Sequence, residues 1–182
     1  MTNVVIAGYA RSPFTLARKG ALARVRPDNM AAEVVRGLIA QTGVAPEDIE
    51  DIVMGCAFPE GEQGMNVARL VGLLADLPLS VGGCTVNRFC GSSMQSVHMA
   101  AGQIKMGAGD VFIAAGVESM TRIPMGGYNP LFNPVLAKKS SATPFFFFAA
   151  MMLIDFILVA AIYPETKGVS LEQLEQKLGV AD

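Results

Sequence analysis

Hydrophobic positions along the first 130 or so residues alternate between the period of a strand and the period of a helix. Val4–Ala7 is a continuous apolar run, as in a buried strand, and a helical period follows from Met30 to Ile39, with Asp28 as its N-cap and Gly43 at its end. The later segments repeat this alternation: strands at Ile52–Met54, Cys84–Val86 and Val111–Ala115, and helices at Asn66–Ala75 and Gly91–Met106. The order βαβαβαβ predicts an α/β fold with a mostly parallel sheet and helices on its faces.

The last of these helices has an apolar face. Met94, Val97, Ala101 and Ile104 share one side of it.

A second kind of pattern occupies the C-terminal part of the chain. The 19 residues from Phe145 to Tyr163 carry a single charge, Asp155, and leave no polar stripe on a helix. A helix of that length is about 28 Å long, close to the roughly 30 Å hydrocarbon core of a bilayer. We therefore expect a hydrophobic helix over residues 144–163 that can span a membrane.

Composition and charge exclude several classes of function. Hydrophobic residues make up 52% of the 182 residues and charged residues 16%, against about 45–50% and about 25% in typical soluble domains. The net charge of −2 and the absence of long basic runs argue against nucleic-acid binding. With three cysteines and one histidine, neither a disulfide framework nor a metal site is expected, and no bound cofactor is implied.

One segment carries candidate chemistry. Cys90 falls between a predicted strand and a predicted helix, where unpaired N–H groups and the positive end of the helix dipole favour a thiolate. The thiolate is the nucleophilic form of cysteine. The small residues Gly91, Ser92 and Ser93 leave room for an acyl thioester. From spacing alone, a buried structural cysteine at a turn is an equal alternative.

Several motifs occur in the order found in one enzyme family. The segment from Cys90 to Ile104, the segment Gly116–Met120 and the opening Ala10–Pro13 together resemble the N-terminal part of a thiolase, over residues about 3–134. The resemblance is to the 3-ketoacyl-CoA and acetyl-CoA thiolases of fatty acid metabolism. It implies that Cys90 attacks the 3-keto group of an acyl-CoA, releases acetyl-CoA and passes the acyl group to coenzyme A, or runs the reverse condensation.

The same resemblance implies partners and a compartment. Coenzyme A thioesters would be the substrates, and the substrate-binding residues stay unknown. Thiolases form homo-oligomers and work in the cytoplasm or an organelle matrix, and we carry both over as expectations.

The resemblance covers only about the first third of a thiolase, so we expect a truncated N-terminal layer. A complete thiolase has a second half that supplies a general-base histidine and a second cysteine, and no position here matches either. Whether the chain is an enzyme is therefore open, and we expect turnover to be absent or very low. His98 lies eight residues after Cys90 on the same helix, about 12 Å along the axis and beyond the reach of a general base. We interpret the other polar and sulfur groups as structural: His98 as a packed helix residue, Cys56 and Cys84 as small core residues, Glu118 as an exposed loop carboxylate, and Asn87 and Arg88 as residues that shape the turn.

The C-terminal tail resembles a different family. The motif Pro164–Gly168 and the following residues to Glu172 resemble the segment after the last membrane helix of sugar porters of the major facilitator superfamily, over residues about 143–178. One helix cannot form a central sugar pathway, so we do not expect transport by this chain alone. Ser170 also fits the N-cap of a short helix. If the hydrophobic helix spans a membrane, Lys138 and Lys139 favour an inverted tail, with the N-terminal side inside.

Two partial patterns in one chain indicate a fusion, a rearranged gene or a mis-joined gene model. The expected organisation is a partial thiolase domain over 1–134, a join over 135–143, the hydrophobic helix over 144–163 and a polar tail over 164–182. The alternative function is a non-catalytic fragment that is membrane-anchored or bound to a partner.

Overall fold

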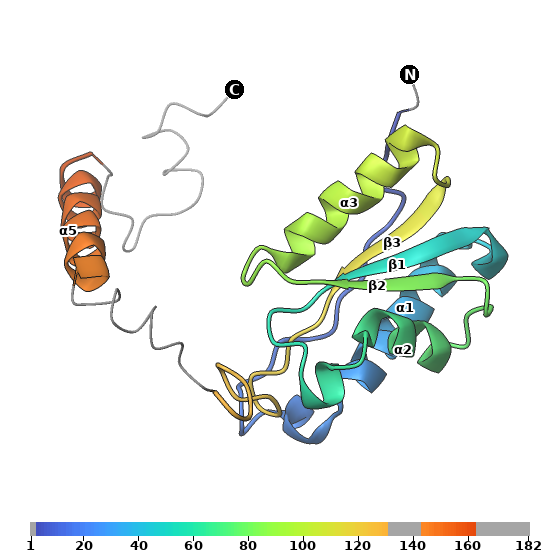
Figure 1. The fold of residues 1–182 in the computed structure, drawn as a ribbon, viewed down its shortest axis with the longest axis horizontal. Helices are drawn as coiled ribbons and strands as arrows, with labels where there is room; N and C mark the ends of the chain where they lie inside the picture. The colour runs from blue at the N-terminus through green and yellow to red at the C-terminus, as the bar shows by residue number, and fades with distance from the viewer. Residues whose placement is uncertain (1–2, 131–142, 163–182) are drawn as a thin grey trace, which may run out of the picture. The chain divides into compact units, whose positions relative to one another are not determined.

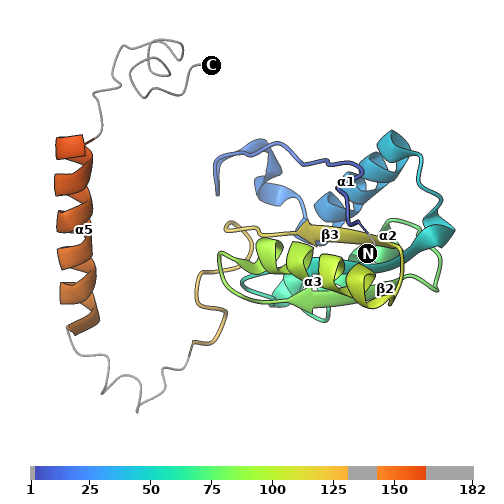
Figure 2. The same cartoon turned by 90° about the horizontal axis from the view of Figure 1, so that it is seen from above.

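The computed structural model describes residues 3–130 and 143–162, which belong to two units that divide after Pro130. In the first unit, helices cover both faces of a small parallel sheet, with α1 and α2 on one face and α3 on the other (Figure 1, Figure 2). The elements are α1 (Pro27–Thr42), β1 (Ile49–Gly55), α2 (Val67–Leu74), β2 (Gly82–Val86), α3 (Ser92–Met106) and β3 (Val111–Gly116), with short 3-10 turns η1 (Ala21–Arg24), η2 (Pro46–Asp48) and η3 (Gly61–Gln63).

The sheet has the strand order β2-β1-β3. Both pairings are parallel, and Val53 of the central strand lies opposite Cys84 on one side and Ala114 on the other. The α/β class and the parallel sheet predicted from the alternating periods are therefore confirmed. Because the strands are parallel, their carboxyl ends meet at one edge, where the segments after all three strands lie together.

Large aliphatic side chains fill the face of the sheet that α1 and α2 cover. Ile52 and Met54 of β1 are 0% and 1% exposed, and they share a cluster with Val67 and Val71 of α2 and with Val35 of α1. This cluster is the hydrophobic core of the first unit.

The predicted first strand, Val4–Ala7, is not a strand in the structure. Val5 and Ile6 are 77% and 83% exposed. A strand needs a neighbour whose N–H and C=O groups pair with its own, and among the described residues no strand pairs with this segment. The apolar residues favour an extended backbone, but their sequence does not determine whether another strand pairs with them.

The face of α3 that packs on the sheet is not the one that carries Met94 and Val97. Ser92, Ser96 and Ala100 are buried, whereas Met94 and Val97 are 62% and 41% exposed. The reason is steric, because small side chains let the helix backbone approach the strands closely. A Cβ added at Gly55 of β1 would lie 2.3 Å from the carbonyl carbon of Ser92.

The start of α1 is a smaller correction. The N-cap is Arg26, and Pro27 begins the helix, so Asp28 lies in the first turn. The Asp28 carboxylate is almost buried and forms an ion pair of 2.7 Å with Arg26. The predicted end of this helix is confirmed, since Gly43 adopts a left-handed conformation with φ +69°.

The second unit contains a helix, α5 (Thr143–Ile162). Every side chain that the structure describes in it is exposed, Phe146 and Phe156 at 74% and 69%. Within residues 3–130 and 143–162, no helix combines the length and the apolar character that crossing a membrane requires. The expectation that Phe145–Tyr163 spans a membrane is thus not supported. Asp155 lies near the middle of this helix, where a carboxylate is costly to place in hydrocarbon.

Some predictions concern residues outside the described part of the chain. The proposed join at Lys138–Ser141, Tyr163, the polar tail over 164–182 and the short helix capped by Ser170 all lie there.

Candidate functional site

Cys90 lies at the carboxyl edge of the sheet, in the turn that joins β2 to α3. Gly91 is the N-cap of α3, and Cys90 is exposed just before it. The hydroxyl of Ser92 accepts a hydrogen bond from the Arg88 N–H at 2.9 Å and donates one to the Phe89 carbonyl at 2.6 Å. These bonds close the turn, so that Cys90 is exposed directly before the first residues of a helix of 15 residues.

The residue before the thiol has an unusual backbone. Phe89 adopts φ +47°, a left-handed conformation that a bulky residue adopts only at a cost of order 1–3 kcal/mol. The Asn87 side-chain carbonyl accepts the Phe89 N–H at 2.9 Å, which stabilises this conformation. The prediction that Asn87 shapes the turn is confirmed, and Arg88 also holds it through a 2.7 Å bond to Gln95.

The three cysteines have different surroundings. Cys56, after β1, is 1% exposed, and burial, with the Glu118 charge as a second cause, raises the pKa of its thiol to about 11. Cys56 is therefore a protonated core residue at neutral pH, as predicted. Cys84 on β2 is half-buried and Cys90 is exposed. Of the three thiols, Cys90 is the one open to a reagent at the helix N-terminus.

Glu118 is exposed, as predicted, but it is not a free loop carboxylate. Its Oε1 accepts a 2.7 Å hydrogen bond from the side-chain amide of Gln63, and its Oε2 accepts the Ala57 N–H at 2.7 Å. Gln63 is fully buried. Sequence reasoning missed Gln63, because nothing in the short η3 turn indicates that its amide would lie beside a residue 55 positions later.

His98 does not join this group of residues. It lies on α3 eight residues beyond Cys90. Its side chain is exposed, so the prediction of a packed residue is wrong. The sequence pattern placed His98 on this helix correctly. The face of α3 that packs on the sheet is, however, the one with Ser92, Ser96 and Ala100.

A shallow groove of about 400 Å³ lies along the edge strand β2. Its lining includes Asn87, which connects it to the Cys90 turn, and Asn66, whose amide donates to the Gly83 carbonyl at 2.8 Å. The groove lies within the usual size range of small-molecule pockets, about 300–1,000 Å³. The full lining is Pro59, Met65, Asn66, Gly83, Cys84, Thr85 and Asn87.

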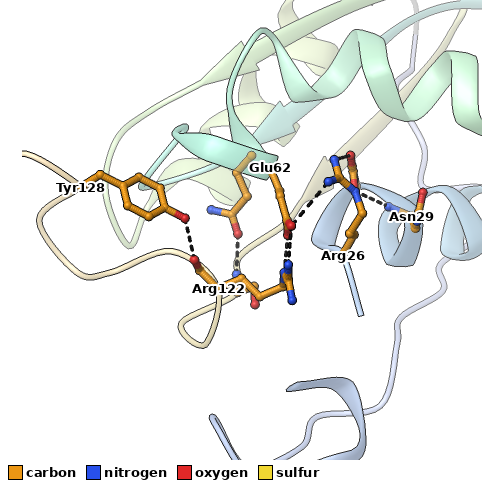
Figure 3. Close-up of polar contacts among 8 residues, drawn as sticks. Arg26, Asn29, Glu62, Arg122 and Tyr128 are labelled. Atoms are coloured by element: carbon orange, nitrogen blue, oxygen red, sulfur yellow. Dashed lines mark hydrogen bonds and ion pairs between the residues drawn. The ribbon is translucent and has the colours of Figure 1, made fainter. Parts of the chain in front are cut away.

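An ion-pair network fixes the segments next to the site (Figure 3). Glu62 binds Arg122 through both carboxylate oxygens and lies 3.4 Å from Arg26, which in turn pairs with Asp28. The hydrogen bond from Arg122 lowers the pKa of Glu62. Because Glu62 directly precedes Gln63, this network holds the η3 turn that carries the buried amide.

The described residues contain no cluster of three or more His, Cys, Asp or Glu side chains able to hold a metal ion. The arrangement at the carboxyl edge therefore offers a thiol, amides and one bound carboxylate.

Comparison with known proteins identifies the family. A family model described as "Thiolase, N-terminal domain" matches residues 4–179. The chain belongs to the thiolase family. It is 46% identical over 140 residues to the 3-ketoacyl-CoA thiolase of Bacillus subtilis, covering 77% of this chain and 36% of that protein. It is 49% identical over 123 residues to the 3-ketoacyl-CoA thiolase of Psychrobacter arcticus, covering 68% of this chain and 32% of that protein.

The thiolase resemblance predicted from the motifs is confirmed. The chain spans about a third of the length of the curated relatives it matches. The family match runs through residues 143–178, and nothing in these comparisons supports the predicted likeness of that segment to sugar porters.

Proposed function

We propose that this thiolase-family chain carries the acyl-accepting step of an acyltransferase, with Cys90 as the nucleophile and coenzyme A thioesters as substrates. The supporting observation is an exposed thiol before the first turn of α3, at the carboxyl edge of a parallel sheet. The buried Cys56 thiol, with its pKa near 11, is not suited to this step.

The chemistry has two transfers. The Cys90 thiolate attacks the 3-keto carbon of an acyl-CoA, the C2–C3 bond breaks, and the released acetyl-CoA takes a proton. The acyl group then passes from Cys90 sulfur to the sulfur of coenzyme A. The condensation runs the same steps backward. Such a reaction belongs in the cytoplasm or an organelle matrix, and the homo-oligomer that the resemblance implies stays a prediction.

The half-reaction can be tested without turnover. The chain is incubated with acetoacetyl-CoA or acetyl-CoA, and the acyl group is located by mass spectrometry of the peptides. We expect an adduct on Cys90 and none in Cys90→Ala, with Cys56 and Cys84 as internal controls in the same digest. If Cys90 in the unmodified chain carries no acyl group, the proposal is wrong.

The second candidate is a binding role without chemistry. The exposed apolar side chains along α5 favour it, because a large exposed apolar surface marks a site of contact with another molecule. It predicts no acyl adduct on any of the three cysteines, so the same experiment separates the two candidates.

A further inference from the structure

A chain of hydrogen bonds connects the buried side-chain amide of Gln63 to the turn before Cys90. Gln63 and Glu118, with which it begins, are linked to that turn through other residues. Gln63 is 0% exposed. The amide N–H₂ group donates to the Phe58 carbonyl at 2.9 Å and to Glu118 at 2.7 Å, and the amide oxygen accepts the Ser119 N–H at 2.6 Å. Because these partners fix which atom of the amide is donor and which is acceptor, Gln63 has a single orientation.

Glu118 continues the chain from the segment after β3 to the segment after β1. One of its oxygens is held by Gln63, and the other accepts the Ala57 N–H. A carboxylate with an N–H donor on each oxygen forms two charge-assisted hydrogen bonds, which are stronger than neutral ones. Glu118 thereby holds the Ala57 N–H in place.

Asn87 binds the other backbone group of Ala57, the carbonyl, which belongs to the next peptide unit. Its amide donates to the Ala57 carbonyl at 2.9 Å, and its own side-chain oxygen accepts the Phe89 N–H at 2.9 Å. Phe89 is the left-handed residue directly before Cys90. The order of contacts is therefore Gln63, Glu118, Ala57, Asn87 and Phe89, with each link a hydrogen bond under 3 Å.

We propose that Glu118 and Gln63 are positioning residues for the Cys90 thiol, acting through the backbone of Ala57 and through Asn87 on the strained Phe89 backbone. A left-handed phenylalanine keeps its conformation only when its surroundings hold it, so releasing any link lets the turn relax and moves the thiol. This inference rests on the proposed role of Cys90 in accepting an acyl group.

The test compares three variants of the full chain. Glu118→Ala removes both acceptors, and Glu118→Gln keeps an acceptor for Ala57 but turns a donor toward Gln63. Glu33→Ala is the matched control, because it also removes an exposed carboxylate with a hydrogen-bond partner, Arg36, but on α1 and outside this chain of hydrogen bonds. The first readout is hydrogen exchange of the Phe89 amide. The second is the rate at which acetyl-CoA acylates Cys90, a step in which the Cys90 S–acyl bond forms, the coenzyme A S–acyl bond breaks, and the Cys90 proton ends on the coenzyme A thiol.

We expect the Phe89 amide to exchange about tenfold faster in Glu118→Ala, because its hydrogen bond loses its support. Acylation of Cys90 should slow by a similar factor, and Glu118→Gln should fall between Glu118→Ala and the unmodified chain. Glu33→Ala should change neither the exchange at Phe89 nor the acylation rate. A purely structural role for Glu118 would instead lower the melting temperature of Glu118→Ala without a selective change at Phe89 or in the acylation rate.

The outcomes for the two proposals are separate. If the unmodified chain is acylated and Glu118→Ala is acylated equally fast, the inference is overturned and the proposed function stands. If the unmodified chain is not acylated, the proposed function fails, and the positioning role is decided by Phe89 exchange alone. Unchanged exchange at Phe89 in Glu118→Ala overturns the inference in either case.

Discussion

The two faces of the sheet are packed by different kinds of side chain. The face under α1 and α2 presents Ile52 and Met54, which are large, aliphatic and fully buried. The face under α3 presents Val53, also fully buried, and Gly55, against which the backbone of Ser92 and Ser93 lies. The first face provides apolar burial by large side chains, and the second adds a close approach of the helix backbone at Gly55.

This difference separates stability from site geometry. Burying a large aliphatic side chain contributes roughly 1.5–3 kcal/mol, which small residues cannot supply. Small residues instead bring the start of α3, with Cys90 just before it, down onto the carboxyl edge. Substitutions on the first face should therefore lower the free energy of unfolding, and substitutions at the close approach should also displace the turn that carries Cys90.

The largest effect should come from the aliphatic face. Ile52→Ala leaves a cavity in the core, and we expect a loss of about 2–5 kcal/mol in the free energy of unfolding. The measurement is urea denaturation of the chain followed by circular dichroism. Ile52→Val is the control, with an expected loss of about 0.5–1.5 kcal/mol. Equal losses in the two variants would show that this face is not close-packed.

The next effect should come from the close approach of α3. In Gly55→Ala the new methyl group would lie 2.3 Å from the Ser92 carbonyl carbon and 2.4 Å from the Ser93 nitrogen, both backbone atoms. We expect a loss of about 1–3 kcal/mol, together with slower acylation of Cys90 as the helix start is displaced.

Gly116→Ala is the matched variant on the neighbouring strand. Its methyl group would meet first the Ser93 hydroxyl, at 1.9 Å, which a rotation of that side chain can move away. The loss should be smaller than in Gly55→Ala. A larger loss in Gly116→Ala would contradict the assignment of the tight contact to the backbone of α3.

A third prediction concerns charge on the α3 face. Asp51 lies two residues before Val53 and four before Gly55, so the pleat places it on the same face as both. Burial raises the pKa of its carboxyl group. Among the described residues, its Oδ1 has no hydrogen-bond partner. Its charged form therefore opposes folding, and this cost disappears as the pH falls through the raised folded pKa toward the unfolded value near 3.9.

Asp51→Asn should then raise the melting temperature by a few degrees at pH 7, with the difference from the unmodified chain shrinking as the pH is lowered toward about 4. Thermal melts at several pH values measure it. A difference that grows on acidification would mean that the charged carboxylate is stabilised in the fold.

The smallest effects should come from the outer side of α3. A Cβ at Gly102 would have no heavy atom within 4 Å, so Gly102→Ala should stabilise the chain by about 0.5–1 kcal/mol through helix propensity. Met94→Gln, at a side chain 62% exposed, should change stability by no more than about 0.5 kcal/mol. A loss above about 1 kcal/mol in Met94→Gln, in the same denaturation assay, would show that this side is covered.

The sequence by itself determined the local features of this protein. The alternating periods gave the α/β class, the parallel sheet and the three helices of the first unit, because hydrophobic period is a property of neighbouring residues. The motifs around Cys90 identified the thiolase family, and the position of that cysteine between a strand and a helix followed from the same pattern.

Only the tertiary structure decided which residues meet. Val4–Ala7 has the composition of a strand, but no strand of the described residues pairs with it. The helix α3 turns its small residues to the sheet because a glycine on β1 admits them. Gln63 and Glu118 are 55 residues apart, and their contact depends on the parallel strands bringing two loops to one edge. Such contacts depend on long-range geometry, which the local pattern of hydrophobic and polar residues does not encode.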